Sequence, residues 1–486
     1  MSPSTSRPPS APYAGQTIHF IGVGGCGMSG LAEFVLTEGG EVSGSDLKAS
    51  AATDRLADLG ATIHIGHSEA NVPPRTDLVA HSAAVKADNR ELVEARRRGI
   101  PALKYAEFLG RLMTLRLGIA VSGTHGKSTT TAMVAYVLSE AGLDPSFVIG
   151  ADVPQLRGGS RVGNGPHLVV EACEYDRSFL NFAPHAAAVL NVEEDHLDYF
   201  RDLADIRSAF AEFASGAAAE GLLVVNGADP GMEEVAAGAN CRVETFGLGG
   251  AWDWHAENLA ADAGRFSFDV CRRDERFTSV GLALAGEHHV LNALAATALC
   301  AWAGAPAEAI SGALGRFQGV SRRMDVLGRA AGVTVVDDYA HHPTEIRATL
   351  EAARQQFTPR RLWVVFQPHQ HSRTRFLLKD FAQALRLADK VIVPDIYFVR
   401  DSENERQAVS SQDLVEEVKR RAGDARYFKD FDSIRRHLVE SLGPGDVLMT
   451  MGAGDVWRLA EPLLADLVGA PGRGPPQAWA DAEEPR

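Results

Sequence analysis

Cysteine is scarce in this chain, with five among 486 residues, and none of the five stands in a CxxC pair. An odd number of scattered cysteines argues against a disulfide framework and against a zinc site, and it fits a reducing compartment. The chain also lacks an apolar run of about 20 residues, the length that spans a bilayer. Residues 1–14 are rich in Ser and Pro and contain no signal-peptide core. We therefore expect a cytoplasmic protein that does not contact a membrane.

A basic excess is lacking as well, because 48 Lys and Arg face 63 Asp and Glu, which gives a net charge of -15. Nucleic-acid-binding proteins usually carry a basic excess or a basic stripe. We therefore expect no nucleic-acid partner. Short basic clusters, such as Arg322-Arg323 and Arg360-Arg361, keep small anions among the candidate ligands.

The length and the hydrophobic content of 45% predict about three domains. Apolar runs of strand length alternate with segments of helical periodicity, which is typical of an α/β fold with largely parallel sheets. We expect an N-terminal Rossmann-like domain, a central domain like the P-loop ATPases and a C-terminal Rossmann-like α/β domain, over residues 15–116, 117–325 and 326–468. The ends, residues 1–14 and 469–486, have the composition of disordered segments.

A glycine-rich segment, Gly22-Val-Gly24-Gly25-Cys-Gly27, lies between a predicted strand and a predicted helix. Glycines there let the backbone approach a phosphate, and the start of the helix attracts it. Asp46 ends the next predicted strand, where a carboxylate can reach a ribose or a base. The pattern predicts a nucleotide site without identifying the nucleotide, and a tight turn with no ligand is the alternative.

A second glycine-bearing loop follows the apolar strand predicted at residues 118–122 and precedes another helix. Backbone N–H groups in such a loop form an anion nest, to which Lys127 adds charge for the β- and γ-phosphates, and the Ser128 hydroxyl can bind Mg²⁺. Val121 stands where a usual P-loop has its first glycine, so this is a shortened variant. The predicted ATP contacts are Gly123, Thr124, His125, Gly126, Lys127, Ser128 and Thr129.

Glu171 and His196 each follow an apolar strand of the predicted central domain. Because the carboxyl ends of parallel strands meet at one edge of a sheet, both side chains are expected near the P-loop. A carboxylate and an imidazole suit Mg²⁺ held between a phosphate and its acceptor. Ser128, Glu171 and His196 are therefore the predicted metal ligands.

His288 and Asn292 are spaced i, i+4 at a predicted helix start and so face one side of it. The asparagine can bond adenine, while a helix start with a buried asparagine is the alternative. In the third domain, polar segments at residues 336–345 and 366–375 each follow a predicted strand. The second of them holds two His and two Arg within seven residues, which indicates an anion site.

These motifs, in this order from Gln16 to Leu464, resemble the Mur ligases, and within them the alanine-adding MurC type. The most specific segments lie at residues 19–30, 44–46, 123–127, 337–345 and 366–369. By this resemblance the three domains bind a UDP-sugar, ATP and an amino acid in turn. The implied reaction joins L-alanine to the carboxylate of UDP-N-acetylmuramate through an acyl phosphate, with ATP and Mg²⁺, and yields ADP and phosphate. This reaction belongs to peptidoglycan biosynthesis. We expect a monomer or a weak homodimer.

The resemblance also assigns roles to single residues. Lys127, Glu171, His196 and Arg323 match the catalytic set, with Arg323 reaching the γ-phosphate when the third domain closes. The remaining matches are His288, Asn292 and Asp338 for ATP, Ser82 beside the first glycine loop and Asp46 for the UDP-sugar, and Tyr339, His369 and Arg373 for the amino acid.

Two positions depart from the pattern of the family. Gln370 stands where many members carry arginine, so the carboxylate of the amino acid would rest on Arg373 alone or on another base. Cys173 replaces a common aspartate in the Glu-Ala-Asp-Glu run, which leaves Glu171 and Glu174 in place.

Three other interpretations were weighed. An oxidoreductase that uses the first glycine loop would leave the P-loop and the third domain without a role. A nucleotide-gated regulator without ligase activity does not need Lys127, Glu171 and His196 together. A tripeptide-adding recycling ligase of the same family differs in the first glycine loop, where residues 25–29 fit the alanine-adding type better.

Overall fold

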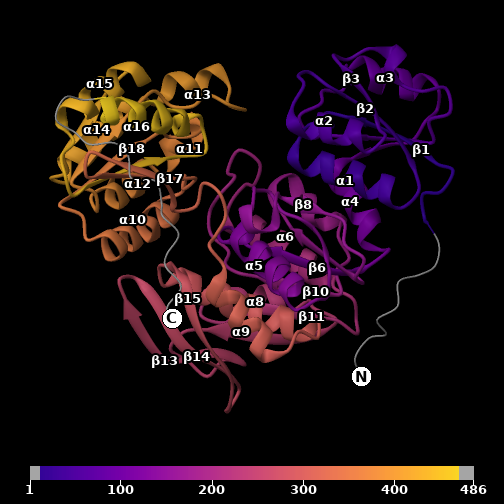
Figure 1. Cartoon of the computed structure of the whole chain (residues 1–486), viewed down its shortest axis with the longest axis horizontal. Helices are drawn as coiled ribbons and strands as arrows, with labels where there is room; N and C mark the ends of the chain where they lie inside the picture. The colour runs from indigo at the N-terminus through magenta and orange to yellow at the C-terminus, as the bar shows by residue number, and fades with distance from the viewer. Residues whose placement is uncertain (1–10, 470–486) are drawn as a thin grey trace.

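The computed structural model describes residues 11–469, which form three α/β domains with one sheet each. The first and third domains flank the central one (Figure 1). The predicted α/β class with largely parallel sheets is confirmed. Within residues 11–469 no helix is long and apolar enough to cross a bilayer.

The first sheet has the order β3-β2-β1-β4-β5, and all its pairs are parallel. Its strands are β1 (Thr17–Ile21), β2 (Glu41–Asp46), β3 (Thr62–Ile65), β4 (Leu78–His81) and β5 (Ala102–Lys104). Its helices are α1 (Cys26–Thr37), α2 (Ala51–Asp58), α3 (Arg90–Arg97) and α4 (Tyr105–Met113), with a 3₁₀ turn at Glu69–Asn71. The order places the ends of β1 and β4 side by side, so their loops share one edge.

The central sheet has ten strands in the order β15-β14-β13-β12-β11-β10-β6-β9-β7-β8. They are β6 (Leu117–Ser122), β7 (Ser146–Val148), β8 (Ser160–Arg161), β9 (His167–Glu171), β10 (Ala186–Val189), β11 (Leu222–Asn226), β12 (Arg242–Gly247), β13 (Trp254–Asp262), β14 (Arg265–Arg272) and β15 (Glu275–Ala285). The helices are α5 (Lys127–Glu140), α6 (Leu203–Ser215), α7 (Met232–Ala236), α8 (His288–Trp302) and α9 (Ala307–Arg316), with 3₁₀ segments at Pro154–Leu156 and Tyr175–Asn181. The antiparallel ladder β13-β14-β15 was not assigned from the sequence.

The third sheet has the order β16-β17-β21-β18-β19-β20 and is parallel except for the β16-β17 pair. Its strands are β16 (Asp325–Ala330), β17 (Val333–Asp338), β18 (Arg361–Phe366), β19 (Lys390–Val393), β20 (Ala425–Tyr427) and β21 (Asp446–Met451). The helices are α10 (Pro343–Phe357), α11 (His371–Phe376), α12 (Leu378–Leu385), α13 (Glu403–Ala408), α14 (Ser411–Arg420), α15 (Phe431–Ser441) and α16 (Ala460–Gly469), with a 3₁₀ turn at Val456–Leu459.

The first and central domains share one hydrophobic core. Phe20 and Phe108 of the first domain belong to the same buried cluster as Phe179 and Phe210 of the central one. The helix α4 lies against the segment Tyr175–Asn181, so closely that a Cβ on Gly110 would overlap the carbonyl of Asn181. The third domain, in contrast, has separate buried clusters made only of its own residues. Apolar burial therefore joins the first two domains and leaves the third attached by other contacts.

The expected disordered ends lie mostly at residues 1–10 and 470–486, outside the described residues. The last part of the expected head is packed against the first domain. Tyr13 is buried, its ring lies 6.1 Å from that of Phe108, and its N–H donates to the carbonyl of Glu38. An aromatic side chain gains free energy by such burial, so residues 11–14 extend the first domain.

Candidate active site

The loop after β6 has the geometry of a phosphate nest. Gly123 and Gly126 adopt φ values of 140° and 82°, which favour glycine, and α5 begins directly afterwards at Lys127. The Lys127 Nζ donates to the carbonyls of Gly123 and Thr124 at 2.6 and 3.0 Å. It also pairs with Glu174 at 2.9 Å. Burial alone would lower the pKa of Lys127, but Glu174 outweighs it and the net pKa is raised, so the lysine stays charged.

The predicted metal ligands Ser128 and Glu171 are in contact. The Ser128 hydroxyl donates to Glu171 Oε1 at 3.0 Å, and the N–H of Gly150 donates to the other carboxylate oxygen at 2.7 Å. Glu171 lies at the end of β9, which pairs with β6 so that Glu171 is opposite Val121. The parallel pairing of β6 and β9 therefore brings the glutamate to the P-loop, as the order of motifs predicts.

His196 lines the same cavity as Ser128 and Glu171. Its Nε2 lies 3.8 Å from carboxylate oxygens of Glu174 and Asp195. Burial is the main reason that its pKa is lowered, although both carboxylates oppose the shift. Its Nδ1 is buried without a hydrogen-bond partner among the described residues. The imidazole is therefore neutral and has a nitrogen lone pair free to bind a cation.

A cavity of about 470 Å³ opens beside the P-loop. His288 and Asn292 both line it from the start of α8, together with Thr129, Arg323 and Asp338. A Cβ on Gly126 would lie 2.7 Å from the Asn292 side chain, so the helix start touches the loop. Burial, and then Arg323, lower the pKa of His288 to about 4, which keeps it neutral. The cavity thus offers neutral nitrogens and an amide next to a phosphate nest.

A second cavity of about 460 Å³ joins the central and third domains. Tyr339, His369 and Arg373 line it together with Lys127 and Glu171. The structure therefore brings the residues predicted for the amino acid together with those predicted for catalysis. Burial lowers the pKa of His369 to about 4, with Arg373 and Arg400 adding to the shift. Cys173 also lines this cavity, and desolvation followed by Glu174 raises the pKa of its thiol to about 12, so it is neutral where an aspartate would be charged.

Buried ion pairs connect the two domains across this cavity. The Nε and Nη2 atoms of Arg373 both donate to Asp195 Oδ1, at 3.0 and 2.6 Å, and the two side chains are 6% and 8% exposed. The Nη1 of Arg373 lies 3.4 Å from His369 Nδ1. Arg323 pairs with Glu345 at 3.4 Å and lies over the Tyr339 ring at 5.2 Å. Neither Asp195 nor Glu345 is a predicted site residue. Asp195 directly precedes the predicted ligand His196, and Glu345 ends the polar segment at residues 336–345.

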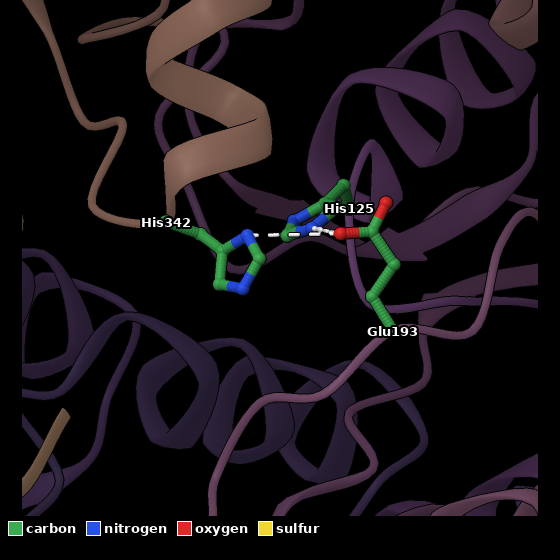
Figure 2. Close-up of side chains that lie close together, drawn as sticks. All are labelled: His125, Glu193 and His342. Carbon is green, nitrogen blue, oxygen red and sulfur yellow. Dashed lines mark ion pairs between the residues drawn. The ribbon is translucent and has the colours of Figure 1, made fainter. Parts of the chain in front are cut away.

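A second set of contacts between the domains surrounds His125 of the P-loop (Figure 2). Its ring nitrogens lie 3.4 Å from Glu193 and 3.4 Å from Glu345, and these carboxylates outweigh burial and raise its pKa to about 9. His342 precedes α10. One of its ring nitrogens lies within 4.8 Å of ligand atoms of His125 and Glu193, so these three residues could share a metal ion. The His342 Nδ1, however, accepts the Thr344 N–H and its Nε2 lies 3.1 Å from the Glu194 carbonyl, so both nitrogens are occupied. The cluster is therefore an ionic contact between the domains.

The residues predicted for the UDP-sugar form a separate group in the first domain. Asp46 Oδ2 accepts the N–H of Gly24 at 2.8 Å, so this carboxylate supports the glycine loop directly. Ser82, at the end of β4, lies beside Gly22, where an added Cβ would be 3.2 Å from the serine Cβ. Gly27 faces the Tyr105 ring, which leaves no room for a side chain. Gly25 is the N-cap residue of α1.

Family models match the chain in three stretches. The Mur ligase family catalytic domain matches residues 17–116, the Mur ligase middle domain residues 121–300 and the Mur ligase glutamate ligase domain residues 322–454. The chain belongs to the Mur ligase family, a family of enzymes.

Individual relatives show which members of the family this chain resembles. Two relatives are UDP-N-acetylmuramate--L-alanine ligases, one of Acetivibrio thermocellus and one of Alkaliphilus metalliredigens. They are 43% and 44% identical to this chain, and each match covers 92% of this chain and 96% or 97% of the relative. The crystal structure of the UDP-N-acetylmuramate-alanine ligase MurC from Thermotoga maritima has a TM-score of 0.76 at 30% identity, covering 93% of this chain and 99% of that one. A murein peptide ligase from Psychrobacter arcticus has a TM-score of 0.68 at 27% identity, covering 94% and 99%.

Proposed function

We propose that this enzyme ligates L-alanine to the carboxylate of UDP-N-acetylmuramate, with ATP hydrolysed to ADP and phosphate, in peptidoglycan biosynthesis. The observation that carries the proposal is the identity of 43–44% to alanine-adding ligases over 92% of the chain. The murein peptide ligase, which represents the recycling alternative, is 27% identical. The oxidoreductase alternative fails because the chain belongs to a ligase family over all three domains. Because the proposed reaction uses ATP and a nucleotide sugar, we propose a cytoplasmic location.

The reaction has two steps in this proposal. An oxygen of the muramoyl carboxylate attacks the γ-phosphorus of ATP, and the bond to ADP breaks. The amine of alanine then attacks the acyl carbon, loses a proton, and inorganic phosphate leaves. Charge accumulates on phosphoryl oxygens in the first step, where Lys127 remains protonated and Arg323 lines the same cavity. His288, Asn292 and Asp338 line the cavity that we assign to the adenosine part of ATP.

The residues Ser128, Glu171 and His196 fit Mg²⁺. Two of them supply the oxygen ligands that this ion prefers, already 3.0 Å apart. The third has a buried ring nitrogen without a partner among the described residues. When bound there, Mg²⁺ would neutralise phosphate oxygens.

The amino-acid pocket is assigned to Tyr339, His369 and Arg373. The pKa of His369 is lowered to about 4 and that of His341 to about 3, mainly by burial, so both rings are neutral. Neutral imidazoles accept hydrogen bonds and can orient the amino group of alanine toward the acyl carbon. We propose a monomer or a weak homodimer as the working state.

The direct test measures phosphate release from ATP with UDP-N-acetylmuramate and one amino acid at a time. We expect L-alanine to support the fastest release, with glycine and L-serine slower. The tripeptide L-alanyl-γ-D-glutamyl-meso-diaminopimelate serves as the substrate of the recycling alternative. Faster release with the tripeptide than with L-alanine would contradict the proposal.

Replacing His196 by alanine is expected to raise the Mg²⁺ concentration needed for half-maximal activity and to lower turnover about tenfold or more, because a ligand to the ion is lost. His167→Ala is the matched control. His167 is also a buried histidine of the central domain without a hydrogen-bond partner among the described residues, but it lies at the start of β9 beside Trp302. A titration of activity against Mg²⁺ checks the prediction. Equal shifts in the two variants would show that His196 does not bind the metal.

A further inference from the structure

The second cavity contains several cations, and most of them already have a carboxylate partner within the chain. Lys127 pairs with Glu174, and Arg373 pairs with Asp195. The other pairs are Arg322 with Asp337 at 2.8 Å and Arg323 with Glu345 at 3.4 Å. Lys127 and Arg323 are assigned to the phosphoryl group, and the charges of Arg322 and Arg373 are largely neutralised by their partners.

Arg400 differs from these cations. It lines the same cavity, and within residues 11–469 no carboxylate lies within ion-pair distance of its guanidinium. The guanidinium carbon lies 4.4 Å from the centre of the Tyr175 ring, which belongs to the central domain. The Tyr175 ring in turn lies 4.9 Å from that of His196. Arg400 is exposed, and a cation–π contact favours one position of the guanidinium while it leaves the N–H groups free to donate.

The segment that carries Arg400 is attached to the segment that carries Gln370. The N–H of Gln370 donates to the Tyr397 carbonyl at 3.1 Å, and the Tyr397 N–H donates to the carbonyl of Pro368 at 2.8 Å. The rings of His369 and Tyr397 are stacked at 5.5 Å. Arg400 is therefore placed relative to the pocket residue His369 by backbone hydrogen bonds and by stacking.

The residue after Arg400 strengthens this attachment. The Asp401 carboxylate accepts the Ser372 hydroxyl at 2.6 Å and the N–H of His371, at the start of α11. Arg400 itself has φ 60°, a conformation that residues other than glycine rarely adopt and that surrounding contacts must maintain. The fixed loop thus presents an arginine in a conformation that costs free energy.

Gln370, in contrast, does not line the second cavity. Its side chain is buried and its Nε2 donates to Asp198 Oδ2 at 3.4 Å. A neutral amide carries no charge that could neutralise a carboxylate, and this one is turned to Asp198. Position 370 therefore supplies no charge to the cavity, whereas position 400 supplies a guanidinium without a carboxylate partner among residues 11–469.

We propose that Arg400 binds the α-carboxylate of the incoming amino acid. This inference rests on the proposed function, because it assigns the carboxylate anchor of the same pocket. The carboxylate is the negative charge that distinguishes an amino acid from a simple amine, so its anchor selects for amino acids. Two of the five N–H donors of Arg373 go to Asp195, which neutralises its charge and leaves it a weaker anchor.

The test compares L-alanine with L-alaninamide, which keeps the amine and lacks the negative charge. In Arg400→Ala we expect the KM for L-alanine to rise about 10- to 100-fold, as for the loss of a charge-assisted hydrogen bond. The KM for ATP and the rate with alaninamide should change less than about twofold. Arg400→Lys should retain part of the preference for L-alanine, because it keeps the charge but loses the forked geometry.

Arg406→Ala is the matched control, because its guanidinium also lies over an aromatic ring, that of Phe398 at 5.2 Å, but does not line the cavity. It should leave every KM unchanged. An unchanged KM for L-alanine in Arg400→Ala would overturn the inference, and so would an equal loss with alanine and alaninamide. Wild-type protein that releases no phosphate with L-alanine would overturn the proposed function itself, and the anchor with it.

Discussion

Lys127→Ala is expected to lower the turnover of L-alanine-dependent phosphate release by at least about 100-fold, the usual effect of removing a group that stabilises a developing anion. In the structure the lysine is held by two carbonyls of its own loop and by Glu174, so its charge is fixed at the centre of the nest. Steady-state kinetics with saturating ATP measure the change. A variant that retains more than a tenth of the wild-type turnover would contradict the role.

The variant also leaves Glu174 without its partner, and this carboxylate is 3% exposed. An unpaired buried charge costs about 3–5 kcal/mol, so part of any loss could come from unfolding. The double variant Lys127→Ala/Glu174→Gln removes that charge and should regain stability in a urea titration without regaining activity. Lys104→Ala serves as a surface control, since Lys104 pairs with Asp176 at an exposed position.

The second large effect is expected for the buried pair between Arg373 and Asp195. Arg373→Ala should lower kcat/KM for alanine by about 100-fold or more, because an unpaired Asp195 costs the closed arrangement about 3–5 kcal/mol. Asp195→Ala should have a similar effect. Since each change breaks the same contact, the double variant should lose much less than the sum of the two free energies. Kinetics on all four proteins give this coupling directly.

The same helix offers a matched control. Arg375 of α11 pairs with Glu405 at 3.0 Å, but the two side chains are 43% and 30% exposed. Exposed pairs contribute about 0–1 kcal/mol, so Arg375→Ala should change kcat/KM less than about fivefold. Strictly additive losses for Arg373 and Asp195 would show that the pair does not form in the reacting enzyme.

Much of the active site follows from the order of strands and loops in the sequence. Ser128 and Glu171 follow neighbouring parallel strands, so their contact was predictable from the rule that such strands end at one edge. His288 and Asn292 share a cavity because i, i+4 positions share a helix face. Both rules can be applied from a motif and the strand or helix beside it in the sequence.

The contacts between domains could not be predicted in this way. Arg373 was assigned to the amino acid, yet two of its donors go to Asp195, which is 178 residues away. Nothing local marks such a pair, because it depends on how the third domain rests on the central one. The strands β13 to β15 were missed for a different reason, since residues 265–272 do alternate between exposed and buried positions. Such an alternating pattern is a usable sequence signal for a half-buried strand.

The core shared by the first and central domains has a thermodynamic consequence. Because Phe20, Phe108, Phe179 and Phe210 belong to one buried cluster, the two domains form a single cooperative unit and the third domain a second one. A ligand that binds only the folded form stabilises the whole unit that contains its site. In the proposed function the first domain binds the nucleotide sugar, so this ligand should also protect the P-loop domain from local opening and from proteolysis.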